Sequence, residues 1–290
     1  MSKNLKVHLL IIDPQNDFMG NDDGTPYGIT LTDGTTLTAS LPVKGGVSDM
    51  KRVAALLKRI GPRLDDVHVT LDSHRVIDVA HPGFWKDAAG KSPSAFTLIR
   101  QADILSGLWE PRAPSQRKRM LDYTGSLEAR GKYLLLIWPE HCLIGTWGHN
   151  VLPPLMHALT AWERRELANV DYVVKGSNPF TEHNGGLMAE VPDPDDPTTQ
   201  LNMDLIRILQ SADIVAIAGE ASSHCVRETV TQIADNIGDD HLTKIHLLIN
   251  AMSPVPAAPG TPDFPAIAQQ FLDDMKIRGM ALSKAEEFLA

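Results

Sequence analysis

The chain is predicted to fold as an α/β protein of three layers, with a doubly wound six-stranded parallel sheet between two layers of helices. Short apolar runs rich in β-branched residues alternate with longer amphipathic stretches, a pattern typical of strand–helix–strand units. Several of these runs, such as Leu9-Leu10-Ile11-Ile12, are apolar without interruption. Strands that are buried on both faces have this character, and they occur mostly in parallel sheets.

The alternation predicts the position of each element. Strands are expected at residues 7–12, 67–71, 133–137, 172–174, 214–218 and 245–249. Helices are expected at residues 47–60, 154–167, 203–210, 224–237 and 265–277. Residues 27–43 alternate apolar and polar side chains around Asp33-Gly34, a pair that suits a two-residue turn. A small β-hairpin is therefore expected after the first strand.

The whole chain, residues 1–290, is predicted to be one domain with insertions at about 24–44, 90–131 and 186–200. A chain of this length buries about three-quarters of the surface that its unfolded form exposes, so it needs no disulfide or metal to form a core. The last insertion contains an acidic, proline-rich run at 190–199, which predicts a stiff loop.

Composition excludes several classes of partner. The formal net charge of −9 argues against nucleic acid, which requires a basic face. No run approaches the roughly 20 apolar residues that cross a bilayer, so no membrane partner is expected. The N-terminal segment does not resemble an export signal, and a cytoplasmic location is therefore expected. The two cysteines, Cys142 and Cys225, should then stay reduced.

Reactive residue types follow the predicted strands. Ligands of open α/β sheets bind beyond the carboxyl ends of the strands. The residues found there are Asp13, Asp72 and His74, the segment 138–142, Lys175 and the segment 220–225. Five separate segments that converge on one edge of the sheet predict an active site.

Cys225 is the candidate nucleophile. It precedes a predicted helix, and unpaired N–H groups at a helix N-terminus stabilise a thiolate. The N–H groups of Ala221 and Cys225 are candidates for an oxyanion hole. Taken alone, a buried cysteine that acts as a small apolar residue remains the alternative. His224 is a weaker candidate base than Asp13, because neighbours on a helix diverge by roughly 100°.

Asp13 and Lys175 favour the chemical interpretation. A buried carboxylate and a buried ammonium are costly unless they are paired or functional. If both face the thiol, Lys175 favours the thiolate and Asp13 accepts the proton. A simple salt bridge between them, or a Lys175 side chain that reaches solvent, is an alternative that spacing leaves open.

A second group predicts a metal site. Asp72 and His74 are two apart on an extended chain and point the same way. His81 and His141 are the further candidate ligands. One carboxylate with two or three imidazoles suits a divalent transition ion, zinc first, with iron and manganese as alternatives. The opposing interpretation is that a surface Asp-x-His pair binds nothing.

These residues also carry a resemblance. Asp13-Pro14-Gln15-Asn16-Asp17-Phe18 follows the first strand, and Trp138-Pro139-Glu140-His141-Cys142 follows the third. Residues 218–226 read Ala-Gly-Glu-Ala-Ser-Ser-His-Cys-Val, and Asp72-x-His74 and Val174-Lys175-Gly176 complete the series in order. Together the five motifs resemble the nicotinamidases, within the isochorismatase-like cysteine hydrolases.

The resemblance implies a catalytic triad of Asp13, Lys175 and Cys225, and it favours Cys225 over Cys142 as nucleophile. It also implies an oxyanion hole formed by Ala221 and Cys225, with a cis peptide between residues 220 and 221. The implied reaction is hydrolysis of nicotinamide to nicotinate and ammonia through a cysteine thioester, as in NAD salvage. Self-association is a further expectation that rests only on the resemblance.

The resemblance assigns the remaining site residues as well. The implied metal ligands are Asp72, His74 and His141, with His81 as a fourth. In nicotinamidases the metal holds the pyridine nitrogen and aromatic side chains sandwich the ring. The implied substrate contacts here are Phe18, Trp138 and Gln15.

One segment departs from the family pattern. His183-Asn184-Gly185-Gly186-Leu187 replaces a Tyr-Ser-Ala/Gly-Phe-like stretch, so an aromatic wall is either missing or supplied by Phe180, Phe84 or Trp85. This motivates a first alternative, a cysteine hydrolase of another small amide or carbamoyl compound. A second is a metal-hydroxide hydrolase in which Cys225 is structural. A third is a ligand-binding protein without activity, against which the intact Asp, Lys and Cys set argues.

Overall fold

The computed structural model describes residues 5–131, 134–257 and 261–290. At its centre lies a six-stranded parallel sheet with the strand order β12-β11-β10-β1-β4-β9. The strands are β1 (Val7–Ile12), β4 (Asp66–Asp72), β9 (Asp171–Lys175), β10 (Ile214–Gly219), β11 (Ile245–Leu248) and β12 (Ala281–Ser283). The predicted α/β class and the strand number are confirmed.

One predicted strand does not belong to this sheet. Of residues 134–137, only β8 (Leu135–Leu136) is a strand, and it pairs antiparallel with β6 (Leu98–Ile99); residue 133 of the prediction lies outside the described residues. The run is apolar because an insertion covers it, with the Ile137 N–H donating to the Thr97 carbonyl at 2.9 Å. The sixth strand is instead β12, whose three half-buried residues are too short to show a pattern.

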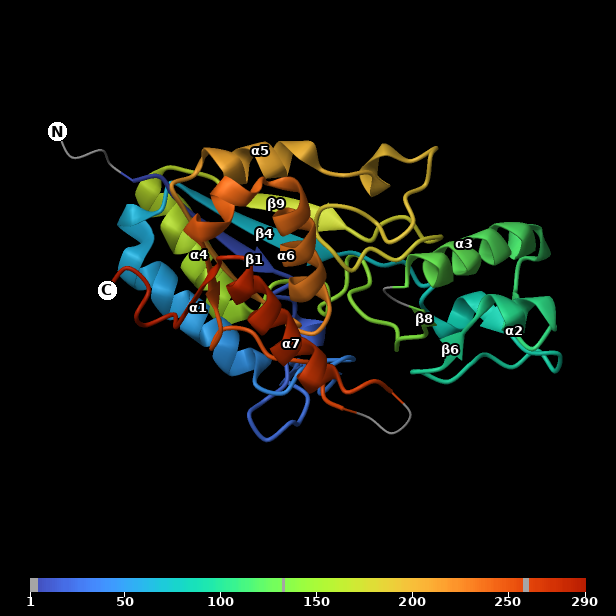
Figure 1. Cartoon of the computed structure of the whole chain (residues 1–290). Coiled ribbons are helices and arrows are strands. Elements are labelled where there is room, and N and C mark those ends of the chain that lie inside the picture. The colour runs from blue at the N-terminus through green and yellow to red at the C-terminus, as the bar shows by residue number, and fades with distance from the viewer. Residues whose placement is uncertain (1–4, 132–133, 258–260) are drawn as a thin grey trace.

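Helices cover both faces of the sheet, which gives the predicted three layers (Figure 1). Alternate side chains of β1 enter opposite cores: Leu9 and Ile11 pack on one side, Leu10 and Ile12 on the other. The first core contains α1 (Gly46–Ile60) and α4 (Pro153–Glu166). The second contains α5 (Met203–Ser211), α6 (Cys225–Asn236) and α7 (Phe264–Ile277). The five predicted helices are confirmed, each within one residue at either end.

The predicted hairpin is also present. β2 (Gly28–Thr30) pairs antiparallel with β3 (Thr36–Thr38). The connection is longer than the two-residue turn expected from Asp33-Gly34, because the Asp33 side chain accepts a hydrogen bond from the Thr35 N–H at 2.8 Å and closes a wider loop. Gly34 has a positive φ of 86°, which favours glycine there.

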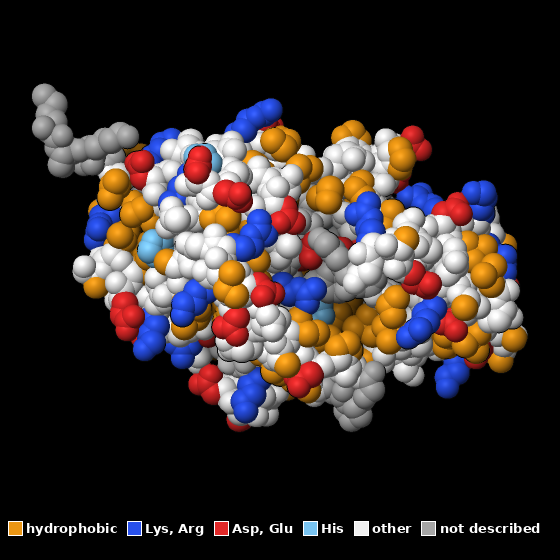
Figure 2. Space-filling model, in the orientation of Figure 1, with side chains coloured by type: hydrophobic (Ala, Val, Ile, Leu, Met, Phe, Trp, Pro, Cys, Tyr) orange, Lys and Arg blue, Asp and Glu red, His pale blue; other side chains and the backbone are white. Residues whose placement is uncertain are grey.

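The insertion at 90–131 folds into elements that the sequence did not predict. It contains α2 (Gln101–Leu105), β7 (Glu110–Pro111) and α3 (Arg117–Arg130), and β7 pairs with β5 (Trp85–Lys86). These elements form a lobe at one end of the sheet (Figure 1). Between this lobe and α7 the surface is hollowed and rich in hydrophobic side chains (Figure 2). In the described ranges we find no helix whose length and apolar character would let it span a bilayer.

Candidate active site and metal centre

The parallel strands deliver the predicted residues to one edge of the sheet. Asp13 directly follows β1, Asp72 ends β4, and Lys175 ends β9. The register pairs Asp72 with Lys175, so these two side chains start level with each other. Cys225 is the first residue of α6, after the turn that leaves β10. The sequence prediction that these segments converge is confirmed.

Lys175 lies at the centre of the group. Its Nζ atom is 3.0 Å from Asp13 Oδ2, 2.9 Å from Asp72 Oδ1 and 3.7 Å from Cys225 Sγ. It also donates to the His183 carbonyl at 2.9 Å. The side chain is 1% exposed, so the alternative in which it reaches solvent is wrong. The ammonium contacts both carboxylates and the thiol at once, so its role exceeds that of a simple Asp13–Lys175 salt bridge.

Thr70 holds Asp13 in place, and the sequence analysis did not single it out. Its Oγ1 donates to Asp13 Oδ1 at 2.6 Å and accepts from the Asp13 N–H at 3.0 Å. Thr70 is fully buried on β4, two residues before Asp72 and therefore on the same face of the strand. No sequence signal separated it from the other polar residues of β4, which include His68.

The charges of the group follow from burial and pairing. Burial raises the pKa of the Cys225 thiol well above its usual range, and it also raises the pKa of Asp13, although Lys175 opposes both shifts. Burial lowers the pKa of Lys175, but Asp13 and Asp72 outweigh it, so that pKa is raised and the ammonium persists. The helix N-terminus and Lys175 were expected to favour a thiolate; burial outweighs them, and the resting sulfur is protonated.

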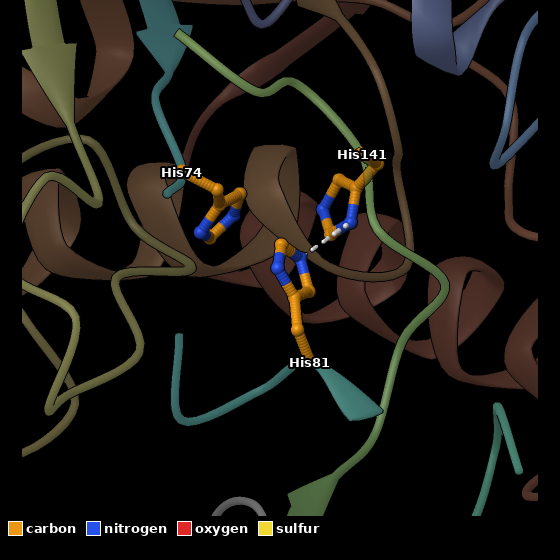
Figure 3. A group of neighbouring side chains, drawn as sticks. All are labelled: His74, His81 and His141. Atoms are coloured by element: carbon orange, nitrogen blue, oxygen red, sulfur yellow. Dashed lines mark hydrogen bonds between the residues drawn. The ribbon is translucent and has the colours of Figure 1, made fainter. Parts of the chain in front are cut away.

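Three imidazoles meet beside this group (Figure 3). His74, His81 and His141 are buried, and they each offer a ring nitrogen such that these atoms lie within 4.8 Å of one another. Asp72 Oδ2 lies 3.1 Å from His74 Nε2 and 3.6 Å from His141 Nε2. The structure thus brings together all four predicted metal ligands, His81 included. Asp72 belongs to both groups, because its other oxygen faces Lys175.

The second nitrogen of each ring is held by the protein. His74 Nδ1 lies 3.1 Å from Asp78 Oδ2, His141 Nδ1 lies 2.8 Å from the Pro139 carbonyl, and His81 Nδ1 lies 3.2 Å from the Arg75 carbonyl. Such contacts orient an imidazole so that its Nε2 is directed at an ion.

The protonation of two of these rings bears on metal binding. Burial lowers the pKa of His81 to about 3, which leaves that ring neutral. Burial also opposes a charge on His74, but Asp72 and Asp78 raise its pKa to about 10, and a bound metal would replace that proton. A carboxylate with three imidazoles fits a divalent transition ion.

A pocket of about 40 Å³ opens onto both groups. Phe18 and Trp138, the predicted ring contacts, line it together with Ala221 and Cys225. The implied cis peptide between Glu220 and Ala221 is present.

Gln15 was expected to contact substrate, but it does not line the pocket. Its Nε2 donates to the Asp72 carbonyl at 2.7 Å, and its Oε1 accepts from the Asp72 N–H at 2.7 Å. The Gln15 amide therefore positions a candidate metal ligand, and its contact with substrate stays a prediction.

The segment 183–187, which departs from the family pattern, supplies a polar wall to this pocket. Phe84, Trp85 and Phe180, proposed as a replacement aromatic wall, are absent from the lining, whereas His183 and Asn184 line it. Burial lowers the pKa of His183 to about 3. Its Nδ1 accepts from the Gly176 N–H at 3.3 Å, so the proton of the neutral ring is on Nε2, which has no hydrogen-bond partner within the described ranges. Sequence reasoning recorded this segment only as a departure.

The remaining two candidates have structural surroundings. Cys142 is completely buried, and its N–H donates to Asp17 Oδ2 at 2.7 Å. Both cysteines are free thiols. Burial lowers the pKa of His224 to about 3, and its Nδ1 lies 2.9 Å from Ser223 Oγ, which makes it a poor base for the neighbouring sulfur.

Comparison with known proteins agrees with this architecture. No protein-family model and no curated protein sequence matches the chain. Among solved structures, the yeast nicotinamidase bound to the inhibitor nicotinaldehyde is 17% identical with a TM-score of 0.59, over 96% of this chain and 99% of that one. The chain has the fold of the nicotinamidases.

Two further solved structures share this fold. The pyrazinamidase of Pyrococcus horikoshii in complex with zinc is 18% identical with a TM-score of 0.51, over 96% of this chain and 99% of that one. An isochorismatase-like hydrolase from Alkaliphilus metalliredigens is 16% identical with a TM-score of 0.50, over 98% of this chain and 97% of that one. At these identities the likeness establishes the fold of the chain and does not establish its activity.

Proposed function

We propose that this protein is an amide hydrolase that uses Cys225 as its nucleophile, and that it hydrolyses nicotinamide to nicotinate and ammonia. The observation that carries the proposal is the position of Lys175 Nζ, in contact with Asp13, Asp72 and the Cys225 sulfur directly behind the pocket that Cys225 and Asp72 line. Nicotinamide is favoured because nicotinamidases share the fold and because Phe18 and Trp138 line the pocket.

The first stage forms a thioester. The Cys225 thiol donates a hydrogen bond to the Asp13 carboxylate, which accepts the thiol proton as the sulfur attacks the amide carbonyl carbon. The Lys175 ammonium stabilises the negative charge that develops on the sulfur. The carbonyl oxygen becomes an oxyanion, to which the N–H groups of Ala221 and Cys225 donate. Asp13 then returns the proton to the departing nitrogen, and ammonia leaves.

The second stage hydrolyses the thioester. Asp13, again a carboxylate, takes a proton from a water molecule that attacks the same carbon. The carbon–sulfur bond breaks, and Asp13 gives its proton to the departing sulfur, which restores the thiol. The acid loses its remaining proton to solvent and leaves as a carboxylate. Thr70 keeps one Asp13 oxygen fixed through its 2.6 Å hydrogen bond, so that the other faces the reacting atoms and Lys175.

Asp72, His74, His81 and His141 would hold a divalent metal, with zinc as the first candidate. Bound there, the ion would supply a Lewis acid that orients a pyridine nitrogen or polarises water. Asp72 connects this centre to the catalytic group, since its second oxygen binds Lys175 at 2.9 Å.

The direct test is ammonia release from nicotinamide by the metal-replete protein, with Cys225→Ala as the paired variant. We expect turnover in the native protein and a loss of at least about a thousandfold in kcat for the variant, as is typical when a covalent nucleophile is removed. A variant that keeps native turnover would rule out the sulfur as nucleophile. That result would instead favour the metal-hydroxide mechanism.

A further inference from the structure

A second cavity, here called the annex, adjoins the pocket at Cys225. The annex has a volume of about 260 Å³, against about 40 Å³ for the inner pocket. Four residues line both spaces and therefore lie at their junction, here called the passage: Trp138, Glu182, Asn184 and His224. Beyond the passage, the annex is walled chiefly by apolar residues, Leu98, Leu134, Leu136, Pro262, Phe264 and Ile267, and Ser223 and Arg227 complete its lining.

The passage and the annex present an apolar surface. The His224 ring lies edge-on to Trp138 at 5.1 Å and to Phe264 at 4.7 Å between centroids, which makes a continuous wall of three rings. His224 is neutral, because burial lowers its pKa to about 3. Ser223 Oγ lies 2.9 Å from its Nδ1 and accepts from the Val255 N–H at 3.1 Å, so the ring is fixed.

The two sides of the annex come from different parts of the chain. Phe264 and Ile267 belong to α7, whereas Leu98 and Leu136 belong to the paired strands β6 and β8 at the base of the insertion lobe. Figure 2 shows a hollow rich in hydrophobic side chains between these two regions. One wall of the annex therefore comes from a helix of the sheet layers, α7, and the other comes from the base of the insertion lobe.

The passage carries no full charge near neutral pH. Burial and the neighbouring Glu190 raise the pKa of Glu182 to about 8, so its carboxyl group is largely protonated. The Asn184 amide donates to Glu190 Oε1 at 3.1 Å. A neutral group can pass between these side chains without leaving an unpaired charge.

We propose that the annex binds an apolar arm of the substrate, so that the preferred substrates are aromatic carboxamides larger than nicotinamide. The arm is attached to the ring, because Trp138, a predicted ring contact, also lines the annex. A mainly apolar cavity of this size beside the inner pocket gains free energy when an apolar group fills it. This inference rests on the proposed amide hydrolysis and names its substrate class.

The test compares nicotinamide with nicotinamides that carry a propyl group at each free ring carbon in turn. For at least one position, kcat/KM of the native protein should rise about tenfold, a part of what burial of three carbon atoms supplies. Ile267→Trp fills the annex from α7 and should abolish this preference, lowering the propyl-to-nicotinamide ratio to about one or below. Leu98→Trp fills it from the opposite wall and should do the same, so the test does not depend on one variant folding.

Ile277→Trp is the matched control: it makes the same change on the same helix, at a side chain that is 83% exposed. It should keep the native ratio. The proposal fails if no propyl position raises kcat/KM, or if both annex variants keep the native preference.

The failure of amide hydrolysis itself would look different, because no amide would then release ammonia. In that event, the dissociation constants of the same amides would test whether the annex binds an apolar arm. Tighter binding of a propyl amide that Ile267→Trp removes would keep the annex assignment, and equal binding of all of them would overturn it.

Discussion

Glu220 has a carboxyl group that is completely buried beside a second one, that of Asp49. Ser253 joins the two, since its N–H donates to Glu220 Oε2 at 3.1 Å and its hydroxyl donates to Asp49 Oδ2 at 2.6 Å. Burial raises the pKa of Glu220 well above its usual range, and the Asp49 carboxylate adds to the shift. Glu220 is therefore a neutral acid next to Ala221, whose N–H is assigned to the oxyanion hole.

This arrangement predicts a pH-dependent stability. Because the pKa is raised in the folded state, unfolding releases a proton above the pKa of an exposed glutamate, about 4.3. The stabilisation is complete below that pH and declines as the pH rises toward the folded-state pKa. Glu220→Gln keeps the shape of the side chain but does not titrate. Its unfolding free energy should therefore increase relative to that of the native protein as the pH rises from 5 to 8, by up to about 1.4 kcal/mol per pH unit. Denaturant unfolding at the two pH values measures this.

Glu287→Gln serves as the control, because this glutamate is exposed on the surface. Its unfolding free energy should follow that of the native protein at both pH values. If Glu220→Gln did so as well, the carboxyl group of Glu220 would be ionised in the folded protein and the neutral acid assignment would be wrong.

The three catalytic residues that the sequence predicted share one property: each stands at the end of a strand or the start of a helix. Asp13, Asp72 and Lys175 could be placed because parallel strands end at a common edge. Thr70 and His183 could not, because their roles depend on which partner the packing brings to them. Sequence spacing gives a residue its position on an element, whereas hydrogen-bond partners come from elements far away in the chain.

The same distinction holds for whole elements. Strands β1, β4, β10 and β11 and the five long helices of the sheet layers were predictable, because burial on one or both faces leaves a strong apolar pattern. β9 is a largely exposed edge strand, and it was predictable from its β-branched run Val173-Val174. α3 was missed, since it begins with Arg117-Lys118-Arg119 and two of its four buried residues, Tyr123 and Thr124, carry hydroxyls, which weakens the apolar pattern. β12 was missed because it is a short edge strand with no fully buried side chain.

α3 matters because it supports the segment that lines the pocket. The hydroxyl of Tyr123 on α3 accepts from the Glu182 N–H at 3.0 Å, and the side chain is buried. Tyr123→Phe leaves that N–H without its acceptor, so the unfolding free energy should fall by about 1–3 kcal/mol. KM for amides should rise as the Glu182 wall loosens. Chemical denaturation and steady-state kinetics test both effects.

Tyr172→Phe removes the same atom from a partly exposed tyrosine, whose hydroxyl donates to the Met156 sulfur at 3.6 Å. We expect a change within about 0.5 kcal/mol for it. Equal effects of the two substitutions would mean that α3 does not brace the pocket.

At the scale of the whole molecule, the candidate metal centre links segments that the sheet alone does not join. His74 follows β4, His81 lies in the loop after it, and His141 comes from the segment that leads from β8 to α4. An ion bound by all three holds these segments together only in the folded state. Metal binding must then stabilise the fold by mass action.

Zinc at about 100 times its dissociation constant should therefore raise the unfolding free energy by about 2.7 kcal/mol. For a chain of this size that corresponds to roughly 5–10 °C in the melting temperature. His141→Ala removes one ligand and should reduce the shift to a small fraction. His157→Ala, an exposed histidine on α4, should keep it in full. If zinc raised the melting temperature of the native chain and of His141→Ala equally, the ion would bind at another site. The three imidazoles would then lie close together because of packing alone.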